Sequence, residues 1–523
     1  MRCLLLILLL SGLSSCRLLP VSTVPTLRLP HSPAIRIPGT PKDPATTAAA
    51  AHRTSQPLEK LALCLLTLEG LAPFQSKAAN RLRSDMTGLA ASIWPTAATT
   101  VSTGGRTWQV LPHPLPRIPI TTAALSRPTG PLHHFRRRGA GTPVLCGPIT
   151  EPDAFPGGLW FSRTATIHIA ENTARLNLID PAHATEETAA EWTLPWARMF
   201  SAASPLDRRK FPDVFRPGKN PNGAHIYRLT PWDPDKRILL LVHGFFDTPH
   251  MWRSVVNDLM RHPEIARHYQ PWVFSWPTGL PLLTAAASLR RELNDALATA
   301  DPSGASFAAQ HITIAGHSMG GLLARTLASS SGTSVWHALF TLPPDELPAD
   351  AADREALREA CFFSTDPRVE RLIFLCVPHQ GSGIASSIIG SSLARLQDIP
   401  ASVAGPVVRL LTFHPHVLQP DLLGDAFQPL HASIPDLRPN SPALRALRTL
   451  PLTTEHHSII ALRFPWPAQW NSDGAVSWQS AHLPSARSET LVRGGHQSYS
   501  SRRALLALRH ILAAPLNPPS RQP

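Results

Sequence analysis

Ser318 lies at the centre of the pentapeptide Gly-His-Ser-Met-Gly, which spans residues 316–320. A serine hydroxyl becomes an effective nucleophile when an imidazole takes its proton and a carboxylate holds that imidazole in one tautomer. The chain supplies both partners after Ser318, with Asp473 in a Ser-Asp-Gly turn and His496 after two glycines. These residues predict attack on an acyl carbonyl, with Ser318 as nucleophile, His496 as base and Asp473 as the acid that orients the base.

Other side chains compete for the two supporting roles. Asp366, which precedes an apolar run at 372–377, is the alternative acid. The sequence has 24 histidines, and the competitors for the base are His456, His457, His482 and His510. His482 follows Asp473 by only nine residues and does not directly precede a final helix, whereas His496 does. We therefore favour Asp473 and His496.

The residues around Ser318 predict the support that such a nucleophile needs. Residues 312–315, Ile-Thr-Ile-Ala, have the apolar continuity of a buried strand, and a helical pattern begins after Ser318. A tight junction between strand and helix exposes the hydroxyl, and Gly316 and Gly320 let the neighbouring backbone pass closely. The N-terminus of the helix also directs its dipole towards the anion that develops during attack.

The wider pattern from about residue 236 onward predicts the fold class. Continuous apolar runs of strand length occupy residues 238–242, 272–274, 312–315, 372–377 and 458–461. Helical patterns lie between these runs, and a final helix covers 505–512. Strands that are apolar on both faces and alternate with helices indicate a parallel sheet. The sequence therefore predicts an α/β domain with a mostly parallel central sheet flanked by helices.

Taken together, these motifs resemble those of bacterial α/β-hydrolases of the lipase and esterase group. The resemblance covers roughly residues 225–515. It rests on His-Gly-Phe at 243–245, the Tyr-to-Leu segment at 269–282, Gly-His-Ser-Met-Gly-Gly at 316–321, Pro-His-Gln-Gly-Ser at 378–382, Asn-Ser-Pro at 440–442, Ser-Asp-Gly at 472–474 and Gly-His at 495–496.

The resemblance implies an α/β-hydrolase fold and hydrolysis of carboxylic esters through an acyl-enzyme, without a metal or organic cofactor. It assigns the two donors of the oxyanion hole to the backbone amides of Phe245 and Met319. His243 precedes Ser318 in the chain, so the same pattern makes it a residue that shapes the loop and not the base. Acyl transfer or thioester hydrolysis by the same three residues is an alternative activity.

The first residues of the chain predict an export signal. Met1 and Arg2 precede an apolar run at residues 4–10, which is too short for the roughly 20 residues that span a bilayer. Leu-Ser-Ser-Cys at 13–16 resembles the cleavage and lipidation motif of bacterial lipoproteins, which implies a lipid anchor on Cys16 in the cell envelope. Arg17 follows where an Asp would favour the inner membrane, so we favour the outer one. An ordinary signal peptide is the alternative.

Composition divides the chain into four regions. We expect a signal peptide at 1–15, a tether rich in Pro, Ala and Thr at 16–58, an accessory region at 59–225 and the catalytic domain at 226–515. Apolar helical patterns within 383–450 predict a cap or lid over an acyl pocket, with ordinary packing as the alternative.

The spacing of Cys64, Cys146, Cys361 and Cys376 fits neither a disulfide framework nor a metal site, and we expect Cys376 to be a buried thiol.

The net charge of +13 indicates an anionic partner or a generally basic surface. The basic run at 136–138 has no alternating aromatic residues, so we do not expect nucleic-acid binding. We expect an ester or lipid-like small-molecule substrate and a membrane reached through Cys16. No pattern in the sequence specifies an oligomeric state. A binding or scaffold lipoprotein that keeps the fold without catalysis is the alternative of a different class.

Overall fold

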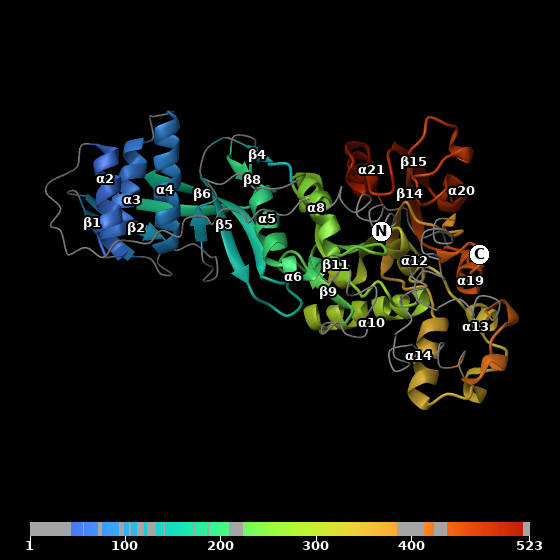
Figure 1. Ribbon diagram of the computed structural model, residues 1–523. Coiled ribbons are helices and arrows are strands. Elements are labelled where there is room, and N and C mark those ends of the chain that lie inside the picture. The colour runs from blue at the N-terminus through green and yellow to red at the C-terminus, as the bar shows by residue number, and fades with distance from the viewer. Residues whose placement is uncertain are drawn as a thin grey trace, which may run out of the picture. The chain divides into compact units, whose positions relative to one another are not determined.

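The computed structural model describes residues 43–55, 57–71, 76–93, 99–103, 106–111, 120–122, 132–137, 139, 142–170, 173–185, 188–208, 223–383, 410, 413–422 and 437–515. The predicted signal peptide, including Cys16, lies outside them. The described chain forms two compact units, one made of residues 43–203 with 260–267 and the other of 204–259 with 268–515. Figure 1 shows the helices and strands of each unit along the chain.

The first unit combines helices with a six-stranded sheet in the order β1-β2-β7-β6-β5-β3. Its helices are α2 (Pro44–Arg53), α3 (Pro57–Leu71), α4 (Lys77–Ile93), α5 (Thr193–Ala202) and α9 (Pro263–Ala266). Its strands are β1 (Thr99–Thr103), β2 (Arg106–Leu111), β3 (Ile120–Thr122), β5 (Thr142–Ile149), β6 (Leu159–Ala170), β7 (Thr173–Ile179) and a short pair, β4 (Arg136–Arg137) with β8 (Ala190–Glu191).

The predicted tether at 16–58 is wrong for its last part, because α2 is a packed helix. Asp43 caps α2 by accepting a hydrogen bond from the Thr46 amide at 2.9 Å. Ala48 and Ala51 are buried in a cluster that includes residues of α3. Alanine is the strongest helix former, but its small side chain leaves no visible apolar stripe in a sequence rich in alanine and threonine.

The second unit is built on a seven-stranded sheet in the order β15-β14-β13-β12-β10-β11-β9. The strands are β9 (His225–Arg228), β10 (Arg237–Val242), β11 (Tyr269–Ser275), β12 (Ile312–His317), β13 (Val369–Leu375), β14 (Glu455–Leu462) and β15 (Ser488–Arg493). All neighbours are parallel except β9, which runs antiparallel to β11. The predicted α/β architecture with a mostly parallel sheet is confirmed.

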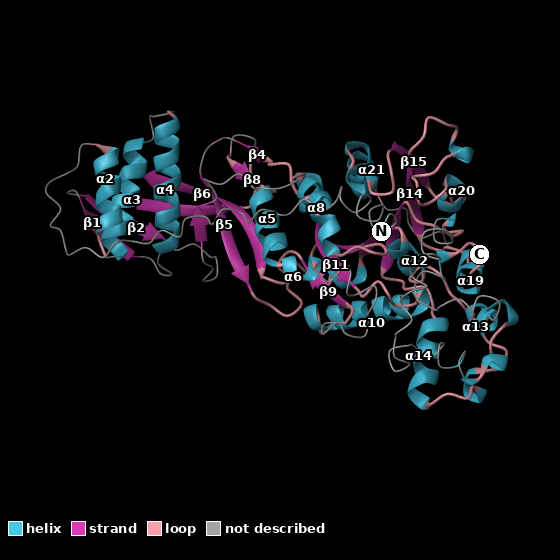
Figure 2. Ribbon diagram, in the orientation of Figure 1, coloured by secondary structure: helices cyan, strands magenta, loops and turns pink. Residues whose placement is uncertain are grey.

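Helices surround this sheet, as Figure 2 shows by colour. The α-helices are α6 (Ser204–Asp207), α8 (Arg253–Leu259), α10 (Leu282–Ala300), α11 (Phe307–Gln310), α12 (Met319–Arg325), α13 (Ser334–Leu339), α14 (Ala351–Cys361), α19 (Pro442–Thr449), α20 (Trp478–Ala481) and α21 (Arg502–Ala513). Short 3₁₀ turns are η2 (Pro249–Trp252), η3 (Pro344–Glu346), η5 (Pro415–Val417), η7 (Ala468–Trp470) and η8 (Ser498–Ser500). Among the described residues, no helix has the length and apolar character needed to cross a membrane.

Alternate residues of the central strands face two groups of helices. Leu240 and Ile314 pack in the main core with apolar residues of α10, which contacts α12 and α14. On the other face, the Tyr269 hydroxyl donates to the Leu512 carbonyl of α21 at 3.0 Å. Both faces of the sheet are therefore covered, which explains the continuous apolar runs in its strands.

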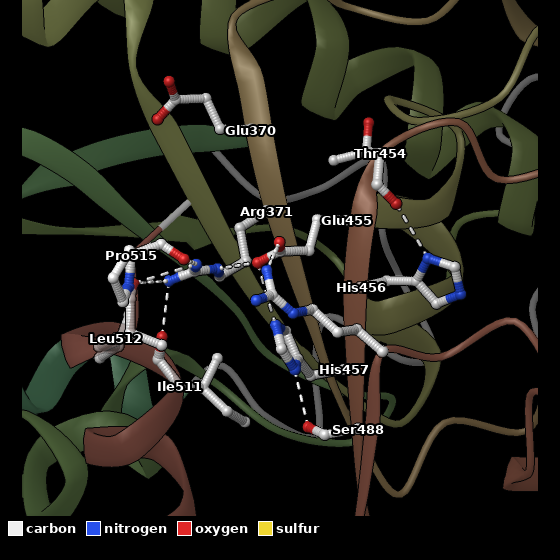
Figure 3. Close-up of polar contacts among 12 residues, drawn as sticks. Glu370, Arg371, Thr454, Glu455, His456, His457, Ser488, Ile511, Leu512 and Pro515 are labelled. Carbon is white, nitrogen blue, oxygen red and sulfur yellow. Dashed lines mark hydrogen bonds and ion pairs between the residues drawn. The ribbon is translucent and has the colours of Figure 1, made fainter. Parts of the chain in front are cut away.

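A buried arginine attaches α21 to the sheet. Arg371 of β13 is fully buried and donates to the Glu455 carboxylate of β14 at 2.7 Å. Its guanidinium also donates to the carbonyls of Ile511, at 2.5 Å, and of Ala514 and Pro515, each at 3.2 Å. Figure 3 shows this arrangement. The Ile511 carbonyl in the last turn of α21, which lacks a partner within the helix, and two carbonyls just after the helix are thereby satisfied.

The predicted domain boundary at 225/226 is wrong, because α6 belongs to the second unit. The Thr248 hydroxyl donates to the Asp207 carboxylate of α6 at 2.9 Å. A four-residue helix without apolar periodicity leaves no signal of this in the sequence. Of the predicted cap at 383–450, the described parts include Val417 and Leu444, which are buried in the main core. Residues 384–409 lie outside the described part, so a lid there stays a prediction.

Candidate active site

Ser318 occupies the junction between β12 and α12 with a backbone that few side chains adopt. Its φ is 52° and its ψ is −128°. A Cβ on Gly316 would lie 2.5 Å from the Gly321 Cα, and a Cβ on Gly320 would lie 2.4 Å from the His243 carbonyl oxygen. Gly316 is therefore required for β12 and α12 to approach each other, and Gly320 is required for α12 to approach the end of β10.

The structure brings Ser318, His496 and Asp473 together. The His496 Nε2 atom lies 2.9 Å from the Ser318 Oγ atom, and His496 Nδ1 lies 2.7 Å from Asp473 Oδ2. Ser318 and Asp473 are buried, whereas His496 is partly exposed. The strands place these residues, since the segment with Asp473 follows β14, the loop with His496 follows β15, and β14 and β15 are neighbours. The arrangement can move a proton from the serine hydroxyl to an imidazole supported by a carboxylate.

Asp473 is held as an anion. Its Oδ1 atom accepts hydrogen bonds from the amides of Ala475, at 2.8 Å, and Val476, at 2.7 Å. Burial raises the pKa of this carboxyl, but the hydrogen bond and charge of His496 together with the two amides lower the pKa by more, so that it lies below its usual value. The carboxylate is therefore ionised at neutral pH and can accept a hydrogen bond from the Nδ1–H of His496.

The competing acid and bases have other partners. Asp366 accepts hydrogen bonds from Arg368 at 2.9 and 2.6 Å. His482 lies 2.6 Å from the Glu489 carboxylate. The other competitors are His456, whose ring contacts Thr454 and Ser485, His457, which contacts Ser488 and Glu455, and His510, which is exposed in the last turn of α21. The structure therefore joins Ser318 to the residues that the sequence analysis favours.

The loop after β10 runs against the nucleophile. A Cβ on Gly244 would lie 2.9 Å from the Ser318 Cβ, so the backbone that leads to Phe245 passes beside the serine. The His243 ring stacks on Trp276 with 5.6 Å between centroids, and the Trp276 indole N–H donates to the His243 carbonyl at 3.2 Å. His243 therefore orders the loop. Met319, the other residue assigned to the oxyanion hole, is the first residue of α12.

His317 is a component of the site that the sequence analysis missed. Its Nε2 atom lies 2.9 Å from the His496 carbonyl oxygen, and its ring contacts the rings of His496 and Tyr499, each with 4.9 Å between centroids. Burial, and then the charge of His496, lower the pKa of His317 to about 3. The ring is therefore neutral at neutral pH and donates its Nε2 proton to that carbonyl. The signal in the sequence that could have identified His317 is its position directly before Ser318.

Cys376 borders Asp473 from the end of β13, with a φ of 52°. As predicted, it is a buried free thiol, and Cys64, Cys146 and Cys361 are buried and free as well. Potential ligand atoms of Cys376, Asp473 and His496 lie within 4.8 Å of one another. Burial and the charge of Asp473 raise the pKa of Cys376, so it remains a thiol and not the thiolate that metals prefer. Cys376 and His496 are therefore better suited to hold the Asp473 carboxylate in place than to bind a metal ion with it.

Part of the chain matches a known protein family. The family described as "Alpha/beta hydrolase family" matches residues 239–507, which include Ser318, Asp473 and His496. No curated protein matches the chain.

Several solved structures are similar to part of the chain. A lipase of Bacillus licheniformis in its mature form is 16% identical, with a TM-score of 0.33, and the match covers 57% of this chain and 100% of the lipase. A metagenomic carboxyl esterase is 13% identical, with 54% and 76% covered and a TM-score of 0.31. A thermophilic esterase of Thermogutta terrifontis, solved with butyrate, is 14% identical, with 55% and 87% covered and a TM-score of 0.27.

Proposed function

The chain belongs to the alpha/beta hydrolase family, and from that premise we propose that it hydrolyses carboxylic esters with Ser318 as its nucleophile. One observation carries the proposal. Ser318 Oγ, the His496 imidazole and the Asp473 carboxylate form a continuous chain of hydrogen bonds, with lengths of 2.9 and 2.7 Å. A serine linked in this way to a base and an ionised carboxylate is an activated nucleophile.

The reaction proceeds in two halves. In the first, Ser318 Oγ attacks the acyl carbonyl while His496 Nε2 takes the hydroxyl proton, and His496 then donates that proton to the departing alcohol. In the second, His496 takes a proton from water as the water oxygen attacks the acyl-enzyme, and His496 then returns that proton to Ser318 Oγ as the bond between Oγ and the acyl carbon breaks and the acid departs. Asp473 accepts a hydrogen bond from the Nδ1–H of His496 throughout, which leaves Nε2 free to receive the serine proton.

The amides of Phe245 and Met319 are our candidates for stabilising the oxyanion. The close approach of Gly244 to Ser318 supports this role for Phe245, because it brings the loop backbone beside the carbon under attack. Met319 begins a helix directly after Ser318, and amides in the first turn of a helix lack partners within the helix. Loss of one such donor typically lowers turnover by about 10²–10³-fold.

A fluorophosphonate probe tests the assignment, because it reacts with activated serines. We expect the full chain to be labelled and to release p-nitrophenol from p-nitrophenyl esters, and the Ser318→Ala variant to do neither. Absence of labelling in the folded parent, or equal labelling of Ser318→Ala, would reject the proposal.

A series of esters with increasing acyl length then measures the depth of the acyl pocket. Added alcohol or thioester substrates distinguish hydrolysis of esters from acyl transfer and from thioester hydrolysis.

We also propose that the protein is exported and lipidated on Cys16, on the strength of the Leu-Ser-Ser-Cys sequence alone. Cells that produce the chain should incorporate radioactive palmitate into it, and the Cys16→Ser variant should not be labelled. Labelling of Cys16→Ser at the level of the parent would contradict this proposal.

A further inference from the structure

The loop that joins β14 to Asp473 exposes an unusual amount of aromatic surface. This segment, residues 463–470, is named the aromatic loop below. Phe464 is 38% exposed, Trp466 is 57% exposed and Trp470 is 70% exposed. Large aromatic side chains clustered at a protein surface mark sites of interaction, whereas single exposed apolar residues need no explanation.

The aromatic loop is held in one conformation. The buried Asn471 side chain donates to the carbonyls of Phe464, at 2.7 Å, and Trp466, at 2.9 Å, and accepts from the Phe464 amide at 3.1 Å. The Phe464 and Trp466 rings stack with 4.7 Å between centroids. Pro465 and Pro467 restrict the backbone further. A loop ordered before binding loses little conformational entropy when it binds, so the exposed rings are prepared for a partner.

The aromatic loop lies at the edge of the sheet that carries the active site. It follows the carboxyl end of β14, and the register pairs Leu462 of β14 with Arg493 of β15. Asp473 follows the aromatic loop and His496 follows β15, so aromatic rings and active-site residues share one edge of a parallel sheet. Whatever binds the loop therefore lies at the same edge of the sheet as Ser318, Asp473 and His496.

The charges beside the rings indicate an anionic partner. Arg463 and Arg493 are exposed at the ends of adjacent parallel strands. Residues 463–470 contain no acidic residue, and the whole chain carries a net charge of +13. Indole rings combine an apolar body with a polar N–H group, and they concentrate where lipid head groups meet acyl chains. Arginine side chains near such a surface interact favourably with anionic lipid.

We propose that the aromatic loop docks on an anionic lipid surface, with Trp466 and Trp470 at the boundary between head groups and acyl chains and with Arg463 and Arg493 against lipid phosphates. A lipid surface fits better than a protein partner because rings and arginines together match both layers of that boundary. The consequence that docking presents lipid esters to Ser318 rests on the proposed function, whereas docking itself does not.

Sedimentation with vesicles tests the proposal. The full chain is used with Cys16→Ser as a common background, so that an anchor on residue 16 cannot contribute to binding. The background protein should bind vesicles of phosphatidylcholine with phosphatidylglycerol more tightly than pure phosphatidylcholine. Replacing both tryptophans, Trp466→Ser with Trp470→Ser, should lower the partition coefficient about tenfold. Arg463→Gln and Arg493→Gln should each lower it about fivefold at low salt.

Two further measurements make the result specific. Phe307→Ser is the matched control, because Phe307 is 39% exposed in α11, which precedes the amino end of β12 at the opposite edge of the sheet. It should bind like the background protein. Brominated lipid should quench part of the tryptophan fluorescence of the background protein, and Trp466→Phe with Trp470→Phe should remove that part while far-ultraviolet circular dichroism stays unchanged.

Three outcomes would overturn the docking proposal. These are absence of vesicle binding by the background protein, unchanged binding by the double serine variant, and equal losses in that variant and in Phe307→Ser. Ser318→Ala separates the two proposals, because it should bind vesicles like the background protein while losing esterase activity. Vesicle binding by a protein that no fluorophosphonate labels would reject the proposed function and support the docking surface.

Discussion

The Nε2 atom of His317 donates a hydrogen bond to the carbonyl oxygen of His496 at 2.9 Å. The residue before the nucleophile thus holds the backbone of the base that activates the nucleophile. Because both residues flank the reacting atoms, this bond couples the position of Ser318 to that of the imidazole. We regard His317 as a positioning residue.

Removing the donor should displace His496 without removing any reacting group. We expect His317→Phe to lower kcat for a soluble p-nitrophenyl ester by about 10- to 100-fold, with little change in KM, because small displacements of a base cost this much. His317→Gln should restore most of the rate, since its amide can donate to the same carbonyl. Equal activity in the two variants would show that the hydrogen bond does not position the base.

The buried state of His317 also predicts a dependence of stability on pH. Its pKa is lowered to about 3, mainly by burial, whereas a histidine in an unfolded chain has a pKa of about 6.5. Between these two values the unfolded chain binds a proton that the folded chain does not, so stability falls as the pH falls. From pH 7 to pH 5 the loss due to His317 is about 2 kcal/mol.

His317→Gln should therefore lose about 2 kcal/mol less than the parent between pH 7 and pH 5. Urea unfolding at the two pH values measures the difference. The exposed His510→Gln is the matched control, and it should behave like the parent. A parent and a His317→Gln variant with the same pH dependence would contradict a neutral, buried His317.

Asp473 should be essential to the rate, and its earlier competitor Asp366 should not. Asp473→Asn places an amide donor opposite His496 Nδ1, which favours the tautomer that cannot accept the proton of Ser318. We expect kcat to fall by about 10³–10⁴-fold. Asp366→Asn loses only contacts with Arg368 and should keep the parental rate when folded. A large loss in Asp366→Asn alone would reverse the assignment.

Gly244 tests how closely the loop after β10 must approach Ser318. A Cβ at this position would lie 2.9 Å from the Ser318 Cβ, which real Cβ atoms essentially never show, and 3.0 Å from His317 Nδ1, which is a tight contact. Gly244→Ala should therefore push the loop away and lower kcat by about 10²-fold or more, the effect of misplacing an oxyanion donor. At Gly383 an added Cβ meets no atom of the described residues within 4 Å, so Gly383→Ala should retain activity. Equal rates in the two variants would argue against this loop as part of the oxyanion hole.

The reacting residues and their strands could be predicted because each left a local signal. The apolar runs that became β10, β12, β13 and β14 record burial on both faces of the sheet, and Ser318, Asp473 and His496 each follow a strand in chain order. Such patterns depend only on neighbours in the sequence.

The residues that support the site left no comparable signal, because their partners are distant in the chain. His317 contacts the carbonyl of a residue 179 positions later, and Arg371 contacts one 140 positions later. A buried arginine or histidine in an apolar strand reads in the sequence as an interruption of the pattern, and only the assembled sheet shows what it binds. For the same reason, the sequence predicts that Cys376 is buried but does not predict that it lies beside Asp473.

Arg371 provides a prediction on stability that is separate from the chemistry. Burial raises the pKa of Glu455, but hydrogen bonds from Arg371 and other groups lower the pKa by more, and the two residues form an ion pair in which Arg371 is fully buried and Glu455 is partly buried. Arg371→Met leaves Glu455 with fewer partners and releases the carbonyls at the end of α21. Removing one member of a fully buried pair costs about 3–5 kcal/mol, and we expect a loss of stability near the lower value, because Glu455 is partly exposed and Arg487 also contacts it.

Arg291→Met is the matched control, because Arg291 and Glu359 form a 3.2 Å ion pair in which both side chains are about half exposed. Its loss should lower the free energy of unfolding by less than about 1 kcal/mol. Arg371 lies near the amino end of β13, whereas Ser318 follows the carboxyl end of β12, so Arg371→Met should keep its rate on a soluble ester below its unfolding temperature. Equal stability of the two variants in urea unfolding would show that α21 does not depend on Arg371 for its attachment to the sheet.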